Sequence, residues 1–507
     1  MMCGTRMKRR ASRHPIRWVV TGVLLAQMAG CAVGPDFQAP QAALPARWDA
    51  AGTAAGGAAP DAARTAISDA APDAQWWRAF NDPTLDALLN RVAGANLDVQ
   101  AAAARLSQAR AALRVADANR LPEVGADTSY RHARASSNGL SDASGRAGKA
   151  DYDLWQGGFD AAWEIDLWGR VRRQAEVAGA AAQASAELQR DVLLAALADT
   201  AQAYMSLRGV QAERAIVAQN LDIARHSQAL TQRRYDDGVA TGVDVAEAAA
   251  QVSTIEARLP DLDNRADRLV NALSRLLALP PAALAGELRS AAPIPAPPAV
   301  ARVGLPAELA RRRPDIRAAE ARLHQATANI GVAVADFYPR ITLSGDAGLQ
   351  ALQFNDLGDW GSRIFGIGPV LHVPLFDGGR LRGQLALSQA RQQEAMIDYQ
   401  RVVLRAWHEV ADALGDYGAL QRQHEKLGAA VAQNQTALEQ ARRQYVAGAA
   451  DFLNVLALQK DLLATQQALA RSDTGMDLAI VRLFKALGGG WESSFPLAAA
   501  NADGDNS

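Results

Sequence analysis

The chain has 507 residues, and its 53 Lys and Arg residues nearly balance its 54 Asp and Glu residues. This balance excludes the polybasic surface that nucleic-acid binding requires. The length would fill several ordinary domains, but aromatic residues make up only 6% of the chain, which is low for one large globular core.

Residues 1–30 are predicted to be a secretory signal peptide. Basic residues precede an apolar stretch, Trp18–Ala29, that is too short to span a bilayer and ends in small residues. Ala29-Gly30-Cys31 resembles a bacterial lipobox, although Met28 stands where leucine is usual. Cys3 would leave with the signal, so Cys31 would be the single cysteine of the mature chain. We therefore predict lipid attachment at Cys31; an ordinary cleavage site is the alternative.

Residues 31–90 are predicted to contain a lipid-anchored tether and the start of the folded body. Ala32–Pro72 is rich in Ala, Gly, Pro and Asp, which is typical of extended chain with little fixed structure. Large apolar residues return at Gln75–Leu89, beginning with Trp76 and Trp77. We expect folded structure to start there.

The sequence then repeats itself. Leu97–Val124 and Pro314–Ile341 are identical at 13 of 28 positions, at an offset of 217 residues. Further along, the offset is 210 and pairs Arg170 with Arg380. A repeat of this length predicts one structural unit built twice. The predicted organisation is a first copy at 91–280, a proline-rich linker at 281–306, a second copy at 307–491 and a flexible tail at 492–507.

Each copy contains two stretches in which apolar and polar residues alternate. They are Glu123–Arg131 and Phe159–Leu167 in the first copy, and Arg340–Leu349 and Phe365–Leu375 in the second. Strands of about 9–11 residues with one apolar and one polar face are typical of transmembrane β-barrels. For any one strand, a soluble sheet packed on helices is the alternative. Four such strands beside very long helices favour the barrel.

A barrel built from these strands needs more than one chain. An unpaired sheet edge cannot persist in lipid, so the barrel must close. Bacterial barrels have at least eight strands, whereas one chain offers four. We therefore expect several copies to share one barrel, and both a dimer and a trimer satisfy this argument.

The strands of each copy are followed by a helix too long for a compact domain. Proline is absent from Glu123–Leu259 and from Leu375–Phe495. In each copy, 68 residue steps separate the opening arginine from the glycine that ends the run, at Gly238 and Gly448. At about 1.5 Å per residue this predicts helices of roughly 100 Å. Regular charges exclude membrane spans, and their alternation with apolar residues indicates coiled-coil-like packing.

Each long helix is predicted to end in a tight turn followed by a shorter return helix. In the first copy, Thr241 and Asp244 have the spacing of a capping box. In the second copy, Asp451 is a good N-cap for a helix that begins at Phe452. Turn formation is the plain interpretation of these residues and their neighbouring glycines.

Motifs for metal, nucleotide or catalytic chemistry are incomplete. His408-Glu409 begins like a zinc-protease motif, but Asp412 occupies the position of the second histidine. Gly145–Lys149 resembles a phosphate-binding loop, but alanine occupies positions 143 and 150, where glycine and Ser or Thr are needed. We predict no enzyme, no cofactor and no metal site.

Motifs along the chain from Cys31 to Trp491 resemble the TolC-like outer-membrane factors of the OprM/NodT lipoprotein type. They include Trp163-Glu-Ile-Asp-Leu-Trp-Gly-Arg170, Pro374-Leu-Phe-Asp-Gly-Gly-Arg380 and Leu487-Gly-Gly-Gly-Trp491. The resemblance implies a mainly α fold with a transmembrane β-barrel. It also implies a homotrimer with a 12-stranded barrel and an α-helical tunnel, lipid-anchored in the outer membrane and extending into the periplasm.

The same resemblance implies a function and partners. The protein would be a passive outer-membrane channel of a tripartite efflux system, docked to a periplasmic membrane-fusion adaptor. An inner-membrane pump of the RND or MFS type would drive export of drugs or toxic small molecules. A polypeptide channel of type I secretion would share the fold and is the alternative. A periplasmic adaptor would carry one hairpin, whereas this sequence has two.

In this family the hairpin tips close the periplasmic mouth. Leu453 matches the position of a constricting leucine, whereas Ala457 stands one turn later, where relatives often carry an aspartate. The resemblance also implies that the tips bind the adaptor, through Gly238, Thr241, Asp244, Gly448, Asp451 and Phe452.

Overall fold

The computed structural model describes residues 32–40, 66–68, 70, 73–134, 136 and 151–492. The predicted signal peptide, Cys31 and the tail after residue 492 lie outside these residues. Two compact units are formed. Unit 1 contains the described parts of 1–39, 108–182 and 321–397, and unit 2 those of 40–107, 183–320 and 398–507. Among the described helices, none is both long enough and apolar enough to cross a membrane.

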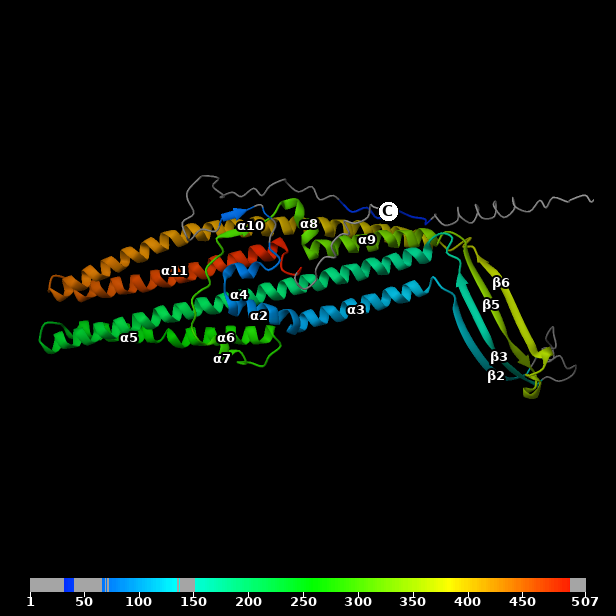
Figure 1. Ribbon diagram of the computed structural model, residues 1–507, viewed down its shortest axis with the longest axis horizontal. Helices are drawn as coiled ribbons and strands as arrows, with labels where there is room; N and C mark the ends of the chain where they lie inside the picture. The colour runs from blue at the N-terminus through cyan, green and yellow to red at the C-terminus, as the bar shows by residue number, and fades with distance from the viewer. Residues whose placement is uncertain are drawn as a thin grey trace, which may run out of the picture. The chain divides into compact units, whose positions relative to one another are not determined.

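The same order of elements occurs twice along the chain (Figure 1). The first copy consists of α3 (Leu97–Ala118), β2 (Glu123–Arg134), β3 (Asp151–Glu164), α4 (Arg170–Asp236), α5 (Gly242–Glu256) and α6 (Leu259–Leu276). The second consists of α9 (Pro314–Ala335), β5 (Arg340–Ala351), β6 (Arg363–His372), α10 (Arg380–Val446) and α11 (Phe452–Leu487). Before, between and within the copies lie β1 (Ala66–Ser68), η1 (Trp76–Phe80), α2 (Pro83–Ala95), α7 (Ala285–Leu288), β4 (Val300–Arg302), η2 (Pro306–Glu308), α8 (Leu309–Arg312), η3 (Phe354–Asp356) and η4 (Trp360–Ser362).

Unit 1 contains the four predicted strands in one antiparallel sheet, in the order β2-β3-β5-β6 (Figure 1). Several predicted strand bounds were wrong. β3 begins at Asp151 rather than Phe159, β2 continues to Arg134, β5 continues to Ala351 and β6 begins at Arg363. β3 ends at Glu164 rather than Leu167, because the Asp166 carboxylate turns to accept the backbone N–H of Arg172 at 2.8 Å, in the first turn of α4. β6 ends at His372 rather than Leu375, and Pro374 just beyond it has no N–H to continue a ladder.

Unit 2 contains the return helices and most of the two long helices that precede them. α4 and α10 each have 67 residues, which confirms the predicted length of about 100 Å. The returns differ between the copies, because α11 runs unbroken for 36 residues whereas the first copy has α5 of 15 and α6 of 18 residues. Pro260 lies in the first turn of α6, where its missing N–H and its ring interrupt the helix. The matching residue of the second copy is Ala470, so α11 continues without a break to Leu487.

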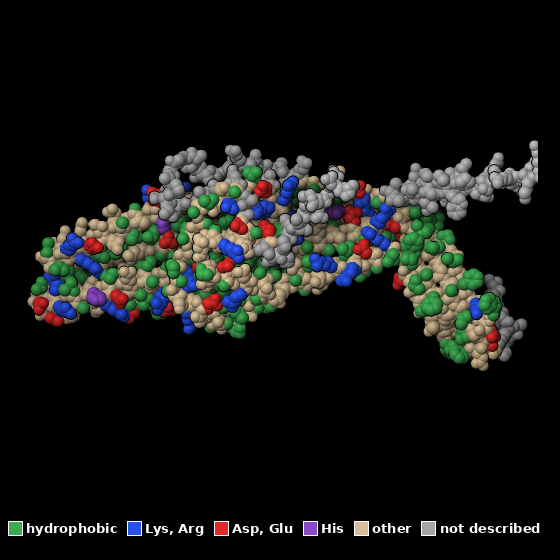
Figure 2. Space-filling view, in the orientation of Figure 1, with side chains coloured by type: hydrophobic (Ala, Val, Ile, Leu, Met, Phe, Trp, Pro, Cys, Tyr) green, Lys and Arg blue, Asp and Glu red, His purple; other side chains and the backbone are tan. Residues whose placement is uncertain are grey.

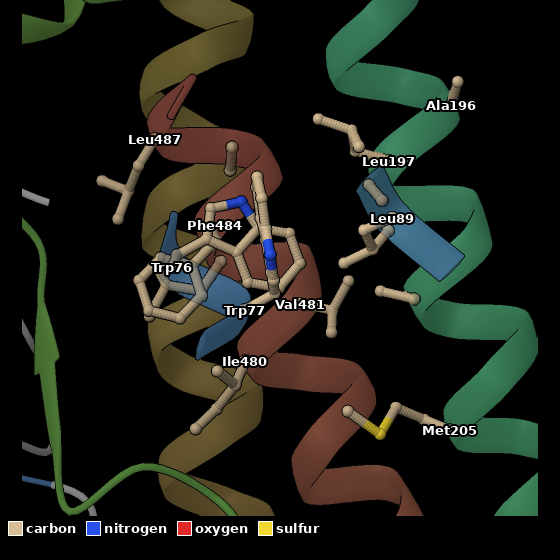
Figure 3. Packing of buried hydrophobic residues seen from close by; sticks show 14 of the residues in the cluster. Trp76, Trp77, Leu89, Ala196, Leu197, Met205, Ile480, Val481, Phe484 and Leu487 are labelled. Carbon is tan, nitrogen blue, oxygen red and sulfur yellow. The ribbon is translucent and has the colours of Figure 1, made fainter. Parts of the chain in front are cut away.

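The main core of unit 2 begins where the sequence predicts folded structure. The Trp76 ring is stacked on Phe484 at 5.1 Å between centroids and meets Trp77 edge-on at 5.7 Å. Figure 3 shows these rings beside aliphatic side chains of α4 and α11, and Leu89 is fully buried. Each large side chain buried in this way contributes about 1.5–3 kcal/mol.

The tether and the linker form structured contacts that the sequence did not predict, among the described residues both near Val33–Phe37 and at Ala66–Ser68. Ala66–Ser68, expected to lack fixed structure, forms β1, which pairs in parallel with β4 at Val300–Arg302. Ala301 in this pair is 1% exposed, so the contact is part of the core of unit 2. A strand of three residues is too short to be recognised from the alternation of apolar and polar residues.

Candidate functional site

One face of the four-stranded sheet is apolar across every strand. Ala126, Phe159, Ala347 and Phe365 lie directly opposite one another in successive strands, and therefore on the same face. Two residues along, the row is Val124, Ala161, Gly345 and Ile367. Figure 2 shows hydrophobic side chains gathered over the strands. The exposed fractions of Phe365 and Ile367 are 85% and 81%, so the described residues leave this face uncovered at β6.

The opposite face of the sheet carries polar and small side chains. One row contains Glu123, Ala162, Ser344 and Gly368. The next contains Gly125, Asp160, Asp346 and Gly366, so two carboxylates lie side by side. Water solvates such a face well and hydrocarbon does not. The sheet therefore separates an apolar environment from an aqueous one.

Among the described strands, β2 and β6 each have one neighbour only. β2 has 12 residues, β3 has 14, β5 has 12 and β6 has 10, which suffices to cross the hydrocarbon layer as tilted strands. Each outer strand presents a row of backbone groups that needs a partner wherever the sheet lies in lipid.

The described segment that follows Cys31 packs against other parts of unit 1. The backbone N–H of Val33 donates to the Trp168 carbonyl at 3.0 Å, and Asp36 accepts from the buried Arg173 guanidinium at 2.6 Å. The Phe37 ring stacks on His324 at 4.5 Å between centroids. The first described residues of the tether therefore lie beside the chain that joins β3 to α4.

The first hairpin tip, in unit 2, has the predicted turn chemistry. Gly238 has φ of 76°, a left-handed conformation that glycine adopts without strain. The Thr241 hydroxyl accepts the Asp244 backbone N–H at 3.2 Å, while the Asp244 carboxylate accepts the Thr241 backbone N–H at 2.8 Å. The capping box at the start of α5 is confirmed.

The second tip is built in a related way. Gly448 has φ of 74°, and the Asp451 side chain caps α11 by accepting the Leu453 N–H. Phe452, predicted as a docking residue, is 2% exposed and packs in the core of this tip, so it is not part of the exposed tip surface. Leu453 is 50% exposed, and Ala457 one turn later is also exposed. Leu453, the predicted gate residue, and Ala457 therefore share an open helix face.

A contact between the two tips was not anticipated from the sequence. The Arg234 guanidinium lies 4.5 Å from the centre of the Tyr445 ring and donates to the Tyr445 carbonyl at 2.8 Å. The repeat pairs Tyr445 with Tyr235, yet Tyr445 is 7% exposed and Tyr235 is 48% exposed. A repeat in sequence does not reveal which copy of a residue becomes the contact, so no sequence signal could have found it.

Within the part of the chain that the structure describes, no three His, Cys, Asp or Glu side chains gather in an arrangement that could hold a metal ion. His408 and Asp412, the ends of the incomplete zinc-protease pattern, are both exposed on α10. The site therefore consists of surfaces: a two-faced sheet with two open edges, and two capped helical tips.

A sheet of this kind combined with two hairpins of very long helices defines a TolC-like outer-membrane channel protein. The sequence profile described as outer membrane efflux protein matches residues 88–279 and again 305–489. The chain belongs to this family, and the two matches coincide with the two copies of the repeat. It is the outer-membrane channel component of a tripartite efflux system.

Individual relatives agree over most of the chain. It is 33% identical over 420 residues to the pyoverdine export outer membrane protein OpmQ of Pseudomonas aeruginosa, covering 83% of this chain and 88% of OpmQ. It is 32% identical over 481 residues to the toluene efflux pump outer membrane protein TtgF of Pseudomonas putida, covering 94% and 97%. The solved structure of the outer-membrane channel OprN superposes with a TM-score of 0.83 at 32% identity, covering 91% of this chain and all of OprN.

Proposed function

We propose that three copies of this chain form one continuous conduit from the periplasm to the outside. β6 of each copy would pair with β2 of the next, which gives a closed barrel of twelve strands and leaves no edge in lipid. The open edges of the four-stranded sheet support this arrangement. Eight strands from a dimer would also close, and the trimer is favoured by resemblance to the family.

The apolar face of the sheet would contact lipid, and the polar face would line the pore. This assignment is supported by Phe365 and Ile367 on one face and by Asp160 and Asp346 on the other. Solutes would cross through water, driven by the inner-membrane partner. The channel itself would perform no chemistry.

Lipid attachment at Cys31 would anchor each copy in the same membrane through acyl chains such as palmitate. The docking of Val33 and Asp36 supports this, because it holds the segment that follows Cys31 against the junction of β3 and α4. Two attachments, a barrel and acyl chains, hold a protein on a membrane more firmly than one.

The hairpin tips would bind a periplasmic adaptor, which in turn binds an RND or MFS pump. Residues of both turns, including the half-buried Asp244 and the exposed Asp451, would form the contact surface, with Phe452 packed beneath. Leu453 would narrow the pore at the tip, without an acidic partner at Ala457. The names of the relatives, toluene efflux and pyoverdine export, support small molecules as the cargo class.

The assignment of faces can be tested with a matched pair of neighbouring alanines on β3. Ala161 lies opposite Val124 and Gly345 on the apolar face, and Ala162 lies opposite Glu123 and Ser344 on the polar face. In cells or liposomes, a water-soluble, membrane-impermeant maleimide should label Ala162→Cys quickly and Ala161→Cys slowly. The unmodified chain is the control, because an acylated Cys31 has no free thiol.

Each outcome of this labelling decides a separate point. Equal labelling of both cysteines would contradict a lipid-facing and a pore-facing side of the sheet. Labelling of the unmodified chain at Cys31 would contradict lipid attachment without affecting the barrel. Light scattering of the detergent-solubilised protein gives the protein mass, and two copies instead of three would overturn the trimer.

A further inference from the structure

Three titratable side chains gather inside unit 2, between α10 and α11, away from the sheet and the tips. Asp473 Oδ1 lies 2.9 Å from His424 Nδ1. Asp477 follows one turn later on α11 and is 0% exposed. Among the described residues, neither carboxylate oxygen of Asp477 has a hydrogen-bond partner.

Such an arrangement is unusual, because buried carboxyl groups in folded proteins are normally hydrogen-bonded or paired with a cation. Gln421 Nε2, three residues before His424 on α10, is also buried without a partner in the described chain. Met476 and Ile480 beside Asp477 belong to the apolar core. The carboxyl group thus lies in an apolar, incompletely satisfied environment.

The charged groups that face Asp477 come from the helices packed around it. On α11 itself, Asp473 is four residues away, where two like charges repel. α10 contributes His424, whose Nδ1 lies within ion-pair distance of Asp473 but forms no hydrogen bond with the described residues. α4 packs closely at this level, since a Cβ atom on Gly209 would clash with the Thr474 side chain. Nη1 of the neighbouring Arg208 donates to Gln211 and to the Ser290 carbonyl, while its buried Nε has no hydrogen-bond partner among the described residues.

These surroundings favour the neutral form of Asp477. Burial raises the pKa of the Asp477 carboxyl to about 8, and the charge of Asp473 acts in the same direction. Burial also raises the pKa of Asp473, while His424 opposes that shift. Asp477 would therefore carry its proton in acidic and neutral conditions and lose it in alkaline conditions.

We propose that Asp477, Asp473 and His424 form a proton-sensitive latch that holds α11 against α10 while Asp477 is protonated and loosens when it ionises. An ionised Asp477 would be a buried charge without a partner beside a second negative charge. Water would have to enter the helix contact, or the helices would have to separate locally. The proposed latch lies in the hairpin that also carries Leu453. It requires no particular cargo and no particular number of copies in the channel.

The direction of the pH effect follows from proton linkage. Asp477 binds its proton more tightly in the folded chain than in the unfolded chain, so its stabilisation is complete at acid pH. It is lost as the pH rises from the ordinary value of 3.8 towards about 8. Across that window the folding equilibrium would shift by up to about tenfold per pH unit.

The test is thermal unfolding of the full-length protein in detergent at about pH 5 and about pH 8.5. The unmodified protein should melt at a lower temperature at the higher pH. Asp477→Asn, which cannot ionise, should lose most of that difference. Asp461→Asn is the matched control, because Asp461 is an exposed residue of the same helix and its replacement should leave the pH dependence intact.

Local measurement and a second variant make the outcome decisive. At the higher pH, hydrogen exchange in the α11 segment around Asp477 should be at least about tenfold slower in Asp477→Asn than in the unmodified protein. If Asp477→Asn fails to fold, Asp473→Asn decides. Loss of the neighbouring negative charge should lower the pKa of Asp477, so the midpoint of the pH dependence should lie below that of the unmodified protein. An unchanged pH dependence in the folded variant, or an unchanged midpoint in Asp473→Asn, would overturn the latch while leaving the channel function intact.

Discussion

The buried Arg313 provides a quantitative test of how unit 2 is held together at the start of α9. Its side chain is only 8% exposed and donates two hydrogen bonds to Asp315, at 3.0 and 2.8 Å. It also donates to Glu409 at 2.7 Å, on α10, and to the Ala486 carbonyl at 2.8 Å, on α11. One guanidinium therefore joins three helices, and Arg313→Ala removes all of these bonds together.

The expected loss can be worked out bond by bond. Although burial alone lowers the pKa of Arg313, its hydrogen bonds and charge pairing with Asp315 and Glu409 raise it above the ordinary value. Breaking a buried ion pair typically costs about 3–5 kcal/mol. The lower end of this range applies to the pair with Asp315, because the Asp315 side chain is 17% exposed. Glu409 is 44% exposed, so solvent screening limits its share to less than about 1 kcal/mol. The unpartnered Ala486 carbonyl adds about 1 kcal/mol, for a total near 4 kcal/mol.

Thermal unfolding followed by circular dichroism at a fixed heating rate measures this loss. Because unfolding entropy grows with chain length, about 4 kcal/mol corresponds to a fall in Tm of roughly 4 °C in a chain of this size. Arg313→Lys keeps the charge but not the fork of two donors, and should lose about half as much. Arg382→Ala on the exposed start of α10 is the control and should change little. An Arg313→Ala variant that melts with the control would refute the three-helix role of this residue.

Two further predictions concern the hairpin tips. Thr241→Ala removes the capping box and should weaken the first turn of α5 by about 1 kcal/mol, seen as roughly fivefold faster hydrogen exchange there. Thr254→Ala, also on α5 but away from the cap, should leave that exchange unchanged, and equal effects of the two would contradict the capping role. Leu453→Ala should raise single-channel conductance in planar bilayers, because it shortens a side chain on the open face at the tip. The neighbouring Asn454→Ala should not, and unchanged conductance in Leu453→Ala would remove Leu453 from the gate.

Much of the fold followed from patterns that act within a few residues. The alternation in Arg340–Leu349 predicts a strand because successive side chains point to opposite faces, and β5 forms there. The long run without proline predicts α10, and the spacing of Thr241 and Asp244 predicts a cap that forms as expected. Each of these signals depends on neighbouring residues along one chain segment, so the sequence alone determines them.

Contacts between distant segments required the tertiary structure. β1 pairs with β4 across more than two hundred residues, and Arg234 of one tip meets Tyr445 of the other. The unpartnered Asp477 is invisible in a sequence in which it is one acid among 54 Asp and Glu. Burial, pairing and pKa depend on which helices pack together, and no local period contains that information. The sequence thus determined the elements and their two faces, whereas the packing decided which charges are buried and which copy of each repeated residue makes the contact.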